Sequence, residues 1–100
     1  MKKENDYRLE DLRGKQADRL LNDPLIKEVL QGMRDALCKN LETSAWRDNE
    51  EREEIYRMLK TVTAFERELI KRVKAGKVAL SYLEQLKKKV GAVKNRVVNI

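Results

Sequence analysis

The C-terminal half of the chain decides the fold, and from Ile55 to Ile100 it reads IYRMLKTVTAFERELIKRVKAGKVALSYLEQLKKKVGAVKNRVVNI. Alternating steps of three and four residues from Ile55 give a seam that is apolar except at Arg72 and Gly76. A repeat of about 3.5 residues keeps one side of a helix facing a partner and is typical of a coiled coil. The segment therefore predicts a long helix packed along its length. The seam comprises Ile55, Met58, Val62, Phe65, Leu69, Arg72, Gly76, Ala79, Leu83, Leu86, Val90, Val93, Val97 and Ile100.

Two interpretations of the break in this seam are open. Residues 74–76, Lys-Ala-Gly, resemble a helix C terminus, with a basic residue in the last turn and glycine beyond it. A separate fourth helix would then run from about Lys77 to Asn95. Alternatively, the helix continues through Gly76 at a cost of about 1 kcal/mol. The intact register on both sides of Gly76 favours a continuous or mildly kinked helix.

Two helix starts precede the seam. Asp23 can cap a helix with its carboxylate, and Pro24 suits the first helical position because an N–H there would lack a partner. Apolar residues then recur at intervals of three and four up to about Thr43. Asp48 followed by Glu51 predicts a capping box at the start of the next helix. These signals predict a helical hairpin.

The chain before Asp23 carries weaker signals. Residues 1–8 are polar and are predicted to fray, while apolar residues from Leu9 onward suggest a short helix that Gly14 weakens. We therefore expect residues 1–22 to form a frayed N terminus and a short helix. Residues 23–100 are expected to form the hairpin, with a basic C-terminal segment at 71–100. The predicted fold class is all-α, with a long, coiled-coil-like third helix.

The composition argues against an enzyme. The chain has no histidine and one cysteine, Cys38, which removes Ser-His-Asp and Cys-His nucleophiles and the paired cysteines of zinc sites. Cys38 is predicted to be a buried, inert thiol. Glu50 and Glu54 are expected to complement the helix dipole and to pair with Arg52 or Arg57 rather than to catalyse. We expect no catalytic residue, no cofactor, no metal and no small-molecule substrate.

The sequence also predicts a cytoplasmic location. No apolar run approaches the roughly 20 residues of a membrane span, and the N terminus lacks the apolar core of a signal peptide. A lone cysteine fits a reducing compartment. We therefore expect no membrane partner.

Charge is divided unevenly along the chain. Residues 1–70 have a net charge of −2 and residues 71–100 a net charge of +8, with Glu84 the one acid there. Such a field attracts polyanions or acidic protein surfaces, although a solvated tail is an equal interpretation. Tyr82 is the one aromatic residue of this segment, which disfavours base stacking and leaves contacts to phosphates. The candidate residues for an anionic partner are Lys71, Lys74, Lys77, Lys87, Lys88, Lys89, Lys94 and Arg96.

Self-association is predicted from the length of the seam. The shorter helix that ends near Thr43 could cover less than half of it, so the remainder requires another chain. Two aromatic residues, Trp46 and Tyr56, are candidate partner anchors, with a Trp46 lid over the hairpin core as the favoured alternative. The candidate oligomerisation residues are Ile55, Met58, Val62, Phe65, Leu69, Leu83, Leu86, Val90 and Val93.

Three segments resemble a family of short, uncharacterised helical proteins that tailed bacteriophages encode, often beside virion structural genes. The matching pieces are Ala17 with residues 20–25 (LLNDPL), residues 47–53 (RDNEERE) and Gly76-Lys77. They span roughly residues 15–80. Trp46 and the basic end after Leu80 depart from the family pattern. The resemblance implies a phage origin and supplies no activity.

Two functions follow as expectations. The first is a non-enzymatic virion assembly or packaging protein, similar to a scaffolding protein or a small terminase subunit. It would self-associate through its long helix and contact DNA or an acidic protein surface through its basic end. The alternative is a phage-encoded inhibitor of a host defence or transcription protein. Either protein would act in the host cytoplasm, and the first could also be associated with the virion.

Overall fold

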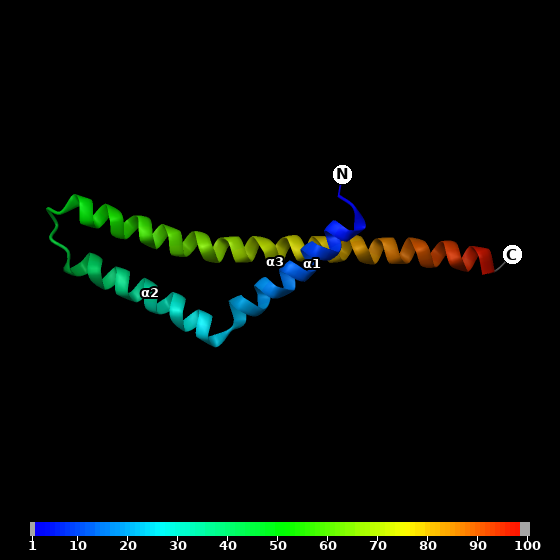
Figure 1. Cartoon of the computed structure of the whole chain (residues 1–100), viewed down its shortest axis with the longest axis horizontal. Helices are drawn as coiled ribbons and strands as arrows, with labels where there is room; N and C mark the ends of the chain where they lie inside the picture. The colour runs from blue at the N-terminus through cyan, green and yellow to red at the C-terminus, as the bar shows by residue number, and fades with distance from the viewer. Residues whose placement is uncertain (1, 99–100) are drawn as a thin grey trace.

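The structure is a computed structural model that describes the backbone of residues 2–98 and the side chains of residues 2–91. It contains α1 (Glu4–Asn22), α2 (Pro24–Thr43) and α3 (Asn49–Val98). The described part of the chain forms no strand. The fold is all-α, with α2 and α3 forming the predicted hairpin and α1 crossing α3 farther along (Figure 1).

Helix α3 is a single helix of 50 residues, and it runs through Gly76 without a break. The interpretation of residues 74–76 as a helix end is therefore wrong, and the continuous interpretation is confirmed. At about 1.5 Å per residue, α3 is roughly 75 Å long. The other two helices run antiparallel to it, one after the other, and meet at an elbow that stands away from α3 (Figure 1).

The elbow between α1 and α2 forms at the predicted cap. One carboxylate oxygen of Asp23 accepts hydrogen bonds from the backbone N–H groups of Leu25 at 2.8 Å and Ile26 at 3.2 Å. Pro24 occupies the first position of α2. This cap satisfies N–H groups that have no partner inside the helix, so it places the start of α2.

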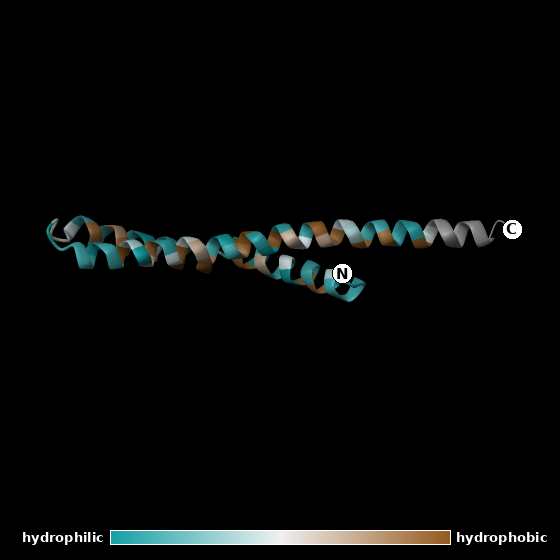
Figure 2. Cartoon of the chain, turned by 90° about the horizontal axis from the view of Figure 1, so that it is seen from above, coloured by the Kyte–Doolittle hydropathy of each residue, from teal (hydrophilic) through white to brown (hydrophobic). Residues whose placement is uncertain are grey.

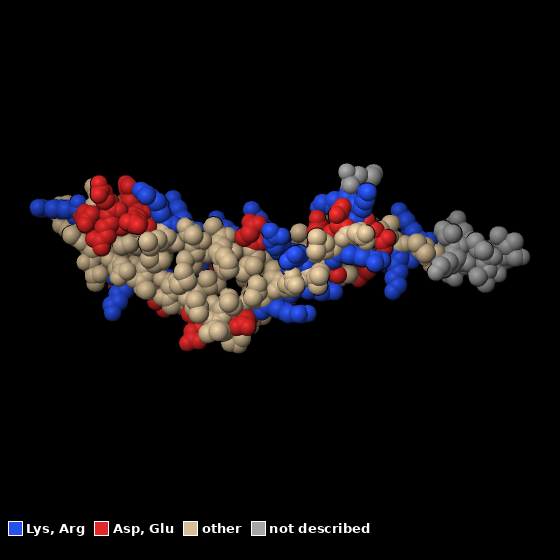
Figure 3. All heavy atoms as spheres, viewed as in Figure 1, with Lys and Arg blue, Asp and Glu red and all other residues tan. Residues whose placement is uncertain are grey.

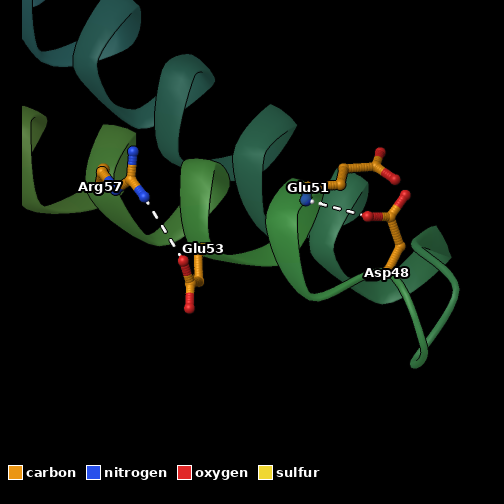
Figure 4. A network of polar contacts seen from close by, with 4 residues as sticks. All are labelled: Asp48, Glu51, Glu53 and Arg57. Carbon is orange, nitrogen blue, oxygen red and sulfur yellow. Dashed lines mark hydrogen bonds and ion pairs between the residues drawn. The ribbon is translucent and has the colours of Figure 1, made fainter.

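The start of α3 is also capped as predicted. The backbone N–H of Glu51 donates to a carboxylate oxygen of Asp48 at 3.1 Å (Figure 4). The backbone N–H of Asp48 donates to the carbonyl oxygen of Ala45 at 2.9 Å, in place of the reciprocal Glu51 bond of a complete capping box. Arg57 pairs with Glu53 at 3.4 Å rather than with the predicted carboxylates (Figure 4).

Arg52 closes the hairpin instead of pairing with Glu50 or Glu54. Its guanidinium donates to the hydroxyl of Ser44 at 3.1 Å and to the carbonyl oxygen of Leu41 at 3.5 Å. A cation is thereby placed on the C-terminal carbonyls of α2, where the helix dipole favours it. The prediction missed this contact because it joins two helices rather than two turns of one helix.

The hairpin packs Ile55 and Val62 in its interior, and both are buried. An ion pair of 2.6 Å between Arg34 of α2 and Glu66 of α3 crosses the hairpin. Both side chains are partly exposed, so this pair contributes modestly to stability. Burial of the seam residues is therefore the main interaction that holds α2 on α3.

Helix α1 begins at Glu4, so it includes polar residues that the sequence analysis left outside the helix. It packs against α3 more extensively than α2 does. A Cβ atom on Gly14 would lie 2.8 Å from the Cα of Gly76 and 2.9 Å from the carbonyl oxygen of Arg72. The two backbones are therefore in direct contact, and glycine is required at both positions. Gly76 interrupts the apolar seam because α1 crosses there.

The crossing continues on both sides of the glycines. Ala17 and Ala79, one turn farther along each helix, are 3% and 0% exposed. Toward the N terminus of α1, the ring of Tyr7 stacks on that of Tyr82 with 5.1 Å between the ring centroids. Small residues thus let the helices approach closely, and an aromatic pair fills the space where they diverge.

The molecule is long and thin, with extents of 81 × 29 × 14 Å and a radius of gyration of 22.1 Å. A compact domain of this length would have a radius of gyration of about 13 Å. Among the side chains of residues 2–91, the buried apolar ones are few: Ala17, Ile55, Val62 and Ala79. An arrangement this thin leaves most apolar side chains partly open to solvent.

We predict that Gly76→Ala destabilises the protein by about 1–3 kcal/mol, because the new methyl group meets backbone atoms of α1 that cannot rotate away. The free energy of unfolding would be measured by urea denaturation followed by circular dichroism. Gly32→Ala is the matched control. Apart from the backbone of its own helix turn and its two chain neighbours, no atom lies within 4 Å of a Cβ built there, so helix propensity should stabilise that variant by up to about 1 kcal/mol. Equal stability of the two variants would contradict the close approach.

Candidate interaction surface

An open apolar groove of about 530 Å³ lies between α2 and α3. Met33 from α2 and Met58 from α3 contribute exposed side chains to it, and buried Val62 lies at its floor. Thioether side chains are flexible and polarisable, so they adapt well to a packing partner. The full lining is Met33, Ala36, Leu37, Glu54, Arg57, Met58, Thr61 and Val62.

A second groove of about 590 Å³ follows along α3, where α1 crosses it. Leu9 and Leu20 of α1 are exposed on one wall, and Leu69 and Arg72 of α3 form part of the other. The chain therefore leaves apolar side chains open along α1 as well as along the hairpin.

Both grooves lie on the same side of α3. Met58, Phe65, Leu69 and Arg72 are separated by seven, four and three residues, which places them in one line along a helix. Phe65 lies between the two grooves and is 52% exposed. We call this surface the apolar face, and its exposed members are Leu9, Leu20, Val29, Met33, Met58 and Phe65.

On the side of the molecule drawn in Figure 3, uncharged atoms fill the middle of the hairpin, while charged atoms gather along the α3 edge, at the elbow and at the hairpin end. An exposed apolar region with a polar rim is the usual form of a protein interaction site. The structure thus presents a candidate interface.

The predicted oligomerisation residues divide into four groups: buried, partly buried, exposed, and outside the described side chains. Ile55 and Val62 are buried within the chain, so their assignment to a surface between chains is corrected: α2 covers them. Leu69 and Leu83 are partly buried, and Val93 lies outside the described side chains. The exposed members are Met58, Phe65, Leu86 and Val90.

The contributions of α1 and α2 to the apolar face were not predicted from the sequence. Leu25, Val29 and Met33 follow one another at intervals of four residues on α2, beside the stripe of Leu30 and Leu37 that faces α3. The signal for this in the sequence is an apolar arc on α2 that is wider than a single helix–helix contact requires. The much longer heptad pattern of α3 is the more prominent signal.

The predicted basic residues follow α3 beyond the hairpin. All the described ones are exposed, while Lys94 and Arg96 lie outside the described side chains. The described lysines are Lys71, Lys74, Lys77, Lys87, Lys88 and Lys89. Acidic atoms gather at the hairpin end (Figure 3), where Glu50, Glu51, Glu53 and Glu54 are exposed at the start of α3. The two ends of α3 therefore carry opposite charge.

Trp46 lies in the turn between α2 and α3 and is 75% exposed, so its prediction as a lid over the core is wrong. The guanidinium carbon of Arg47 lies 4.9 Å from the Trp46 ring centroid, an arrangement that holds both side chains on the outside. The other predicted anchor, Tyr56, is 48% exposed on α3. It lines a separate groove from the one that contains Met58.

Cys38 is exposed, so its prediction as a buried thiol is wrong. Leu37 and Leu41 lie on the side of α2 that faces α3. Cys38 follows Leu37 by about 100° around the helix, so its side chain points away from the hairpin interior. Its apolar sequence neighbour was a poor guide to burial because successive helical residues point in different directions.

The described residues include no group of three or more His, Cys, Asp or Glu side chains placed to hold a metal ion. None of the described helices has the length and apolar character that crossing a membrane requires. Near the N terminus, a hydrogen bond and ion pair with Glu10 raise the pKa of Lys2, which is an exposed surface contact.

Comparison of the chain with protein-family models, with curated proteins and with solved structures gave no match. The surface of the chain itself is therefore the basis for inferring its function.

We predict that Cys38 in the native protein reacts with iodoacetamide at about the same rate as in urea, because α2 presents the thiol to solvent. Mass spectrometry at timed intervals would measure the rate. The variant Cys38→Ser is the blank for nonspecific alkylation. Protection by ten-fold or more in native buffer would contradict the described orientation of α2.

Proposed function

We propose that this chain is a non-enzymatic assembly protein that self-associates through its apolar face and binds an anionic partner through the basic part of α3. The observation that carries the proposal is an accessible surface of 8593 Å². A compact monomer of 11.8 kDa would expose about 5,900 Å².

The excess of about 2,700 Å² supports self-association, because a stable interface needs only about 800 Å² from each partner. Elongation accounts for part of the excess, but it does not require the exposed surface to be apolar. Here Phe65 and Met58 are half exposed, while few side chains of the chain are buried. Contiguous apolar surface of this kind is uncommon on a monomer and is typical of an interface.

Exposed lysines on α3 support the anionic partner. Lys71, Lys74 and Lys77 follow one another at intervals of three residues, beyond the segment that α2 covers. Tyr82 is stacked on Tyr7, which occupies one face of the aromatic ring that a nucleic-acid base would otherwise use. Contacts to phosphate groups, or to carboxylates of an acidic protein, are therefore favoured over base stacking.

The resemblance to phage proteins supports a role in virion assembly or packaging, like that of a scaffolding protein or a small terminase subunit. Such a protein would act in the host cytoplasm and could stay with the virion. The helical hairpin with a long third helix is compatible with this class.

A second candidate function rests on Trp46. Its exposure at the tip of the hairpin, with Arg47 beside it, would suit an inhibitor that inserts this pair into a host protein. In that case the protein would be a monomer, and its apolar face would be exposed to solvent. The oligomeric state of the purified protein separates the two candidates.

We predict that Phe65→Glu weakens self-association at least ten-fold, because it places a charge at the centre of the apolar face. The dissociation constant would be measured by sedimentation equilibrium. Tyr56→Glu is the matched control: the tyrosine is similarly exposed on the same helix but lines another groove. A wild-type protein that stays monomeric at high concentration would contradict the proposed function and favour the inhibitor.

We also predict that the protein binds duplex DNA with an affinity that falls as salt rises, because phosphate contacts release counterions. Replacing Lys71, Lys74 and Lys77 by Glu should reduce the slope of log affinity against log salt by about 3. Fluorescence anisotropy would measure binding. A slope near zero for the wild type would remove phosphate contacts from the proposal and leave an acidic protein as the partner.

A further inference from the structure

Opposite charges lie at the two ends of the described part of α3 and cannot meet within one chain. The acidic cluster is Glu50, Glu51 and Glu54, and the basic cluster is Lys87, Lys88 and Lys89. All six side chains are exposed. Glu54 and Lys87 are 33 residues apart on one continuous helix, which corresponds to about 50 Å. An ion pair between the two clusters therefore requires a second chain.

The apolar face has a raised part and a recessed part, and these two parts are displaced along α3 as the two charge clusters are. Helices α2 and α3 lie nearly in one plane when seen from above, whereas the N-terminal half of α1 leaves that plane (Figure 2). The exposed Leu9 and Leu12 belong to this raised half. The groove with Met33 and Met58 lies on the flat hairpin, toward the other end of α3. A ridge and a recess are thus displaced along the same helix.

We propose that a second copy of this chain binds the apolar face with its α3 antiparallel to the first, so that each α1 ridge lies in the hairpin groove of the other copy. A two-fold axis near Ile70 places Glu54 of one copy opposite Lys87 of the other, because 70 lies midway between them in sequence. This inference rests on the proposed self-association and adds its orientation and contacts.

Charge and shape both disfavour the parallel arrangement. Parallel copies would place the acidic clusters side by side and the basic clusters side by side, which is repulsive at both ends. They would also bring one α1 ridge against the other and leave both grooves open. In the antiparallel arrangement, each feature meets its complement.

The arrangement assigns different partners to two groups of lysines. Lys87, Lys88 and Lys89 bind the acidic cluster of the second copy. Lys71, Lys74 and Lys77 lie close to the two-fold axis in sequence and far from both acidic clusters, so they remain for the external anionic partner. Lys71 also forms a 3.9 Å ion pair with Glu68 of the same helix, and both side chains are exposed. Charge pairing between the two copies thus determines the orientation of the dimer. The lysines that do not pair across the dimer bind the external anionic partner.

Carbodiimide cross-linking tests the orientation. The reagent joins a carboxylate directly to an amine, so a link between Glu50, Glu51 or Glu54 and Lys87, Lys88 or Lys89 cannot form within one chain. A mixture of unlabelled and ¹⁵N-labelled protein would identify links between copies by mass spectrometry. We expect links between the acidic and basic clusters with mixed isotopes. A dimer that lacks these links and joins other sites would overturn the antiparallel arrangement.

Charge exchange provides the second test. Lys87→Glu, Lys88→Glu and Lys89→Glu together should weaken the dimer at least ten-fold at low salt, because like charges then meet at both ends. Adding Glu50→Lys, Glu51→Lys and Glu54→Lys should restore affinity to within about three-fold of wild type. The matched control reverses Lys71, Lys74 and Lys77, which changes the net charge equally and should leave the dimer intact. Circular dichroism would verify that each variant stays helical.

The outcomes separate the inference from the proposed function. A wild-type monomer would contradict both. A dimer whose affinity falls with the first triple substitution and does not recover in the six-fold variant would contradict the charge pairing alone. A dimer that Phe65→Glu disrupts, with recovery on charge exchange and mixed-isotope links, would establish the antiparallel arrangement.

Discussion

The contact between the backbones of α1 and α3 at Gly14 and Gly76 constrains the rest of the structure. It brings α1 so close to α3 that no side chain fits between them, and it thereby places the elbow at Asp23. The direction of α2 follows, because the elbow and the Arg52 contact at the other end of α2 are then both in place. Helices α2 and α3 form one layer, which α1 leaves where it crosses α3, and α3 is the element that the other two share.

This thin arrangement has an energetic consequence. Each helix buries a narrow stripe, so the gain from the hydrophobic effect is small compared with that of a globular domain of similar mass. Ala17 and Ala79 are nearly inaccessible, but they are small, while the larger Phe65 and Met58 stay half exposed. Burial of those larger side chains in a partner would supply stability that one chain lacks. Folding and association are therefore expected to be coupled.

Local signals in the sequence were sufficient to predict where α2 and α3 begin and that α3 is continuous. The Asp23-Pro24 cap, the Asp48 cap and the register across Gly76 all depend on residues within a few turns of one another, and the structure confirms them. The meeting of Gly14 with Gly76 could not be predicted in this way. Two glycines 62 residues apart have no local pattern in common, and each resembles a weak point in its own helix. The candidate interaction surface was predicted in part. The heptad pattern of α3 indicated the α3 residues, whereas the exposed apolar stripes of α1 and α2 can be recognised only when the side of each helix that α3 covers is known.

Helix α3 extends past the last contact with α1, and residues 84–90 are all exposed. A helix advances about 1.5 Å per residue, so this extension acts as a spacer whose length is proportional to the number of residues. Seven residues inserted after Leu86 would move the end outward by about 10 Å and return later side chains to nearly the same side of the helix. Such an insertion would change the separation of the two ends of α3 without altering the hairpin or the glycine crossing.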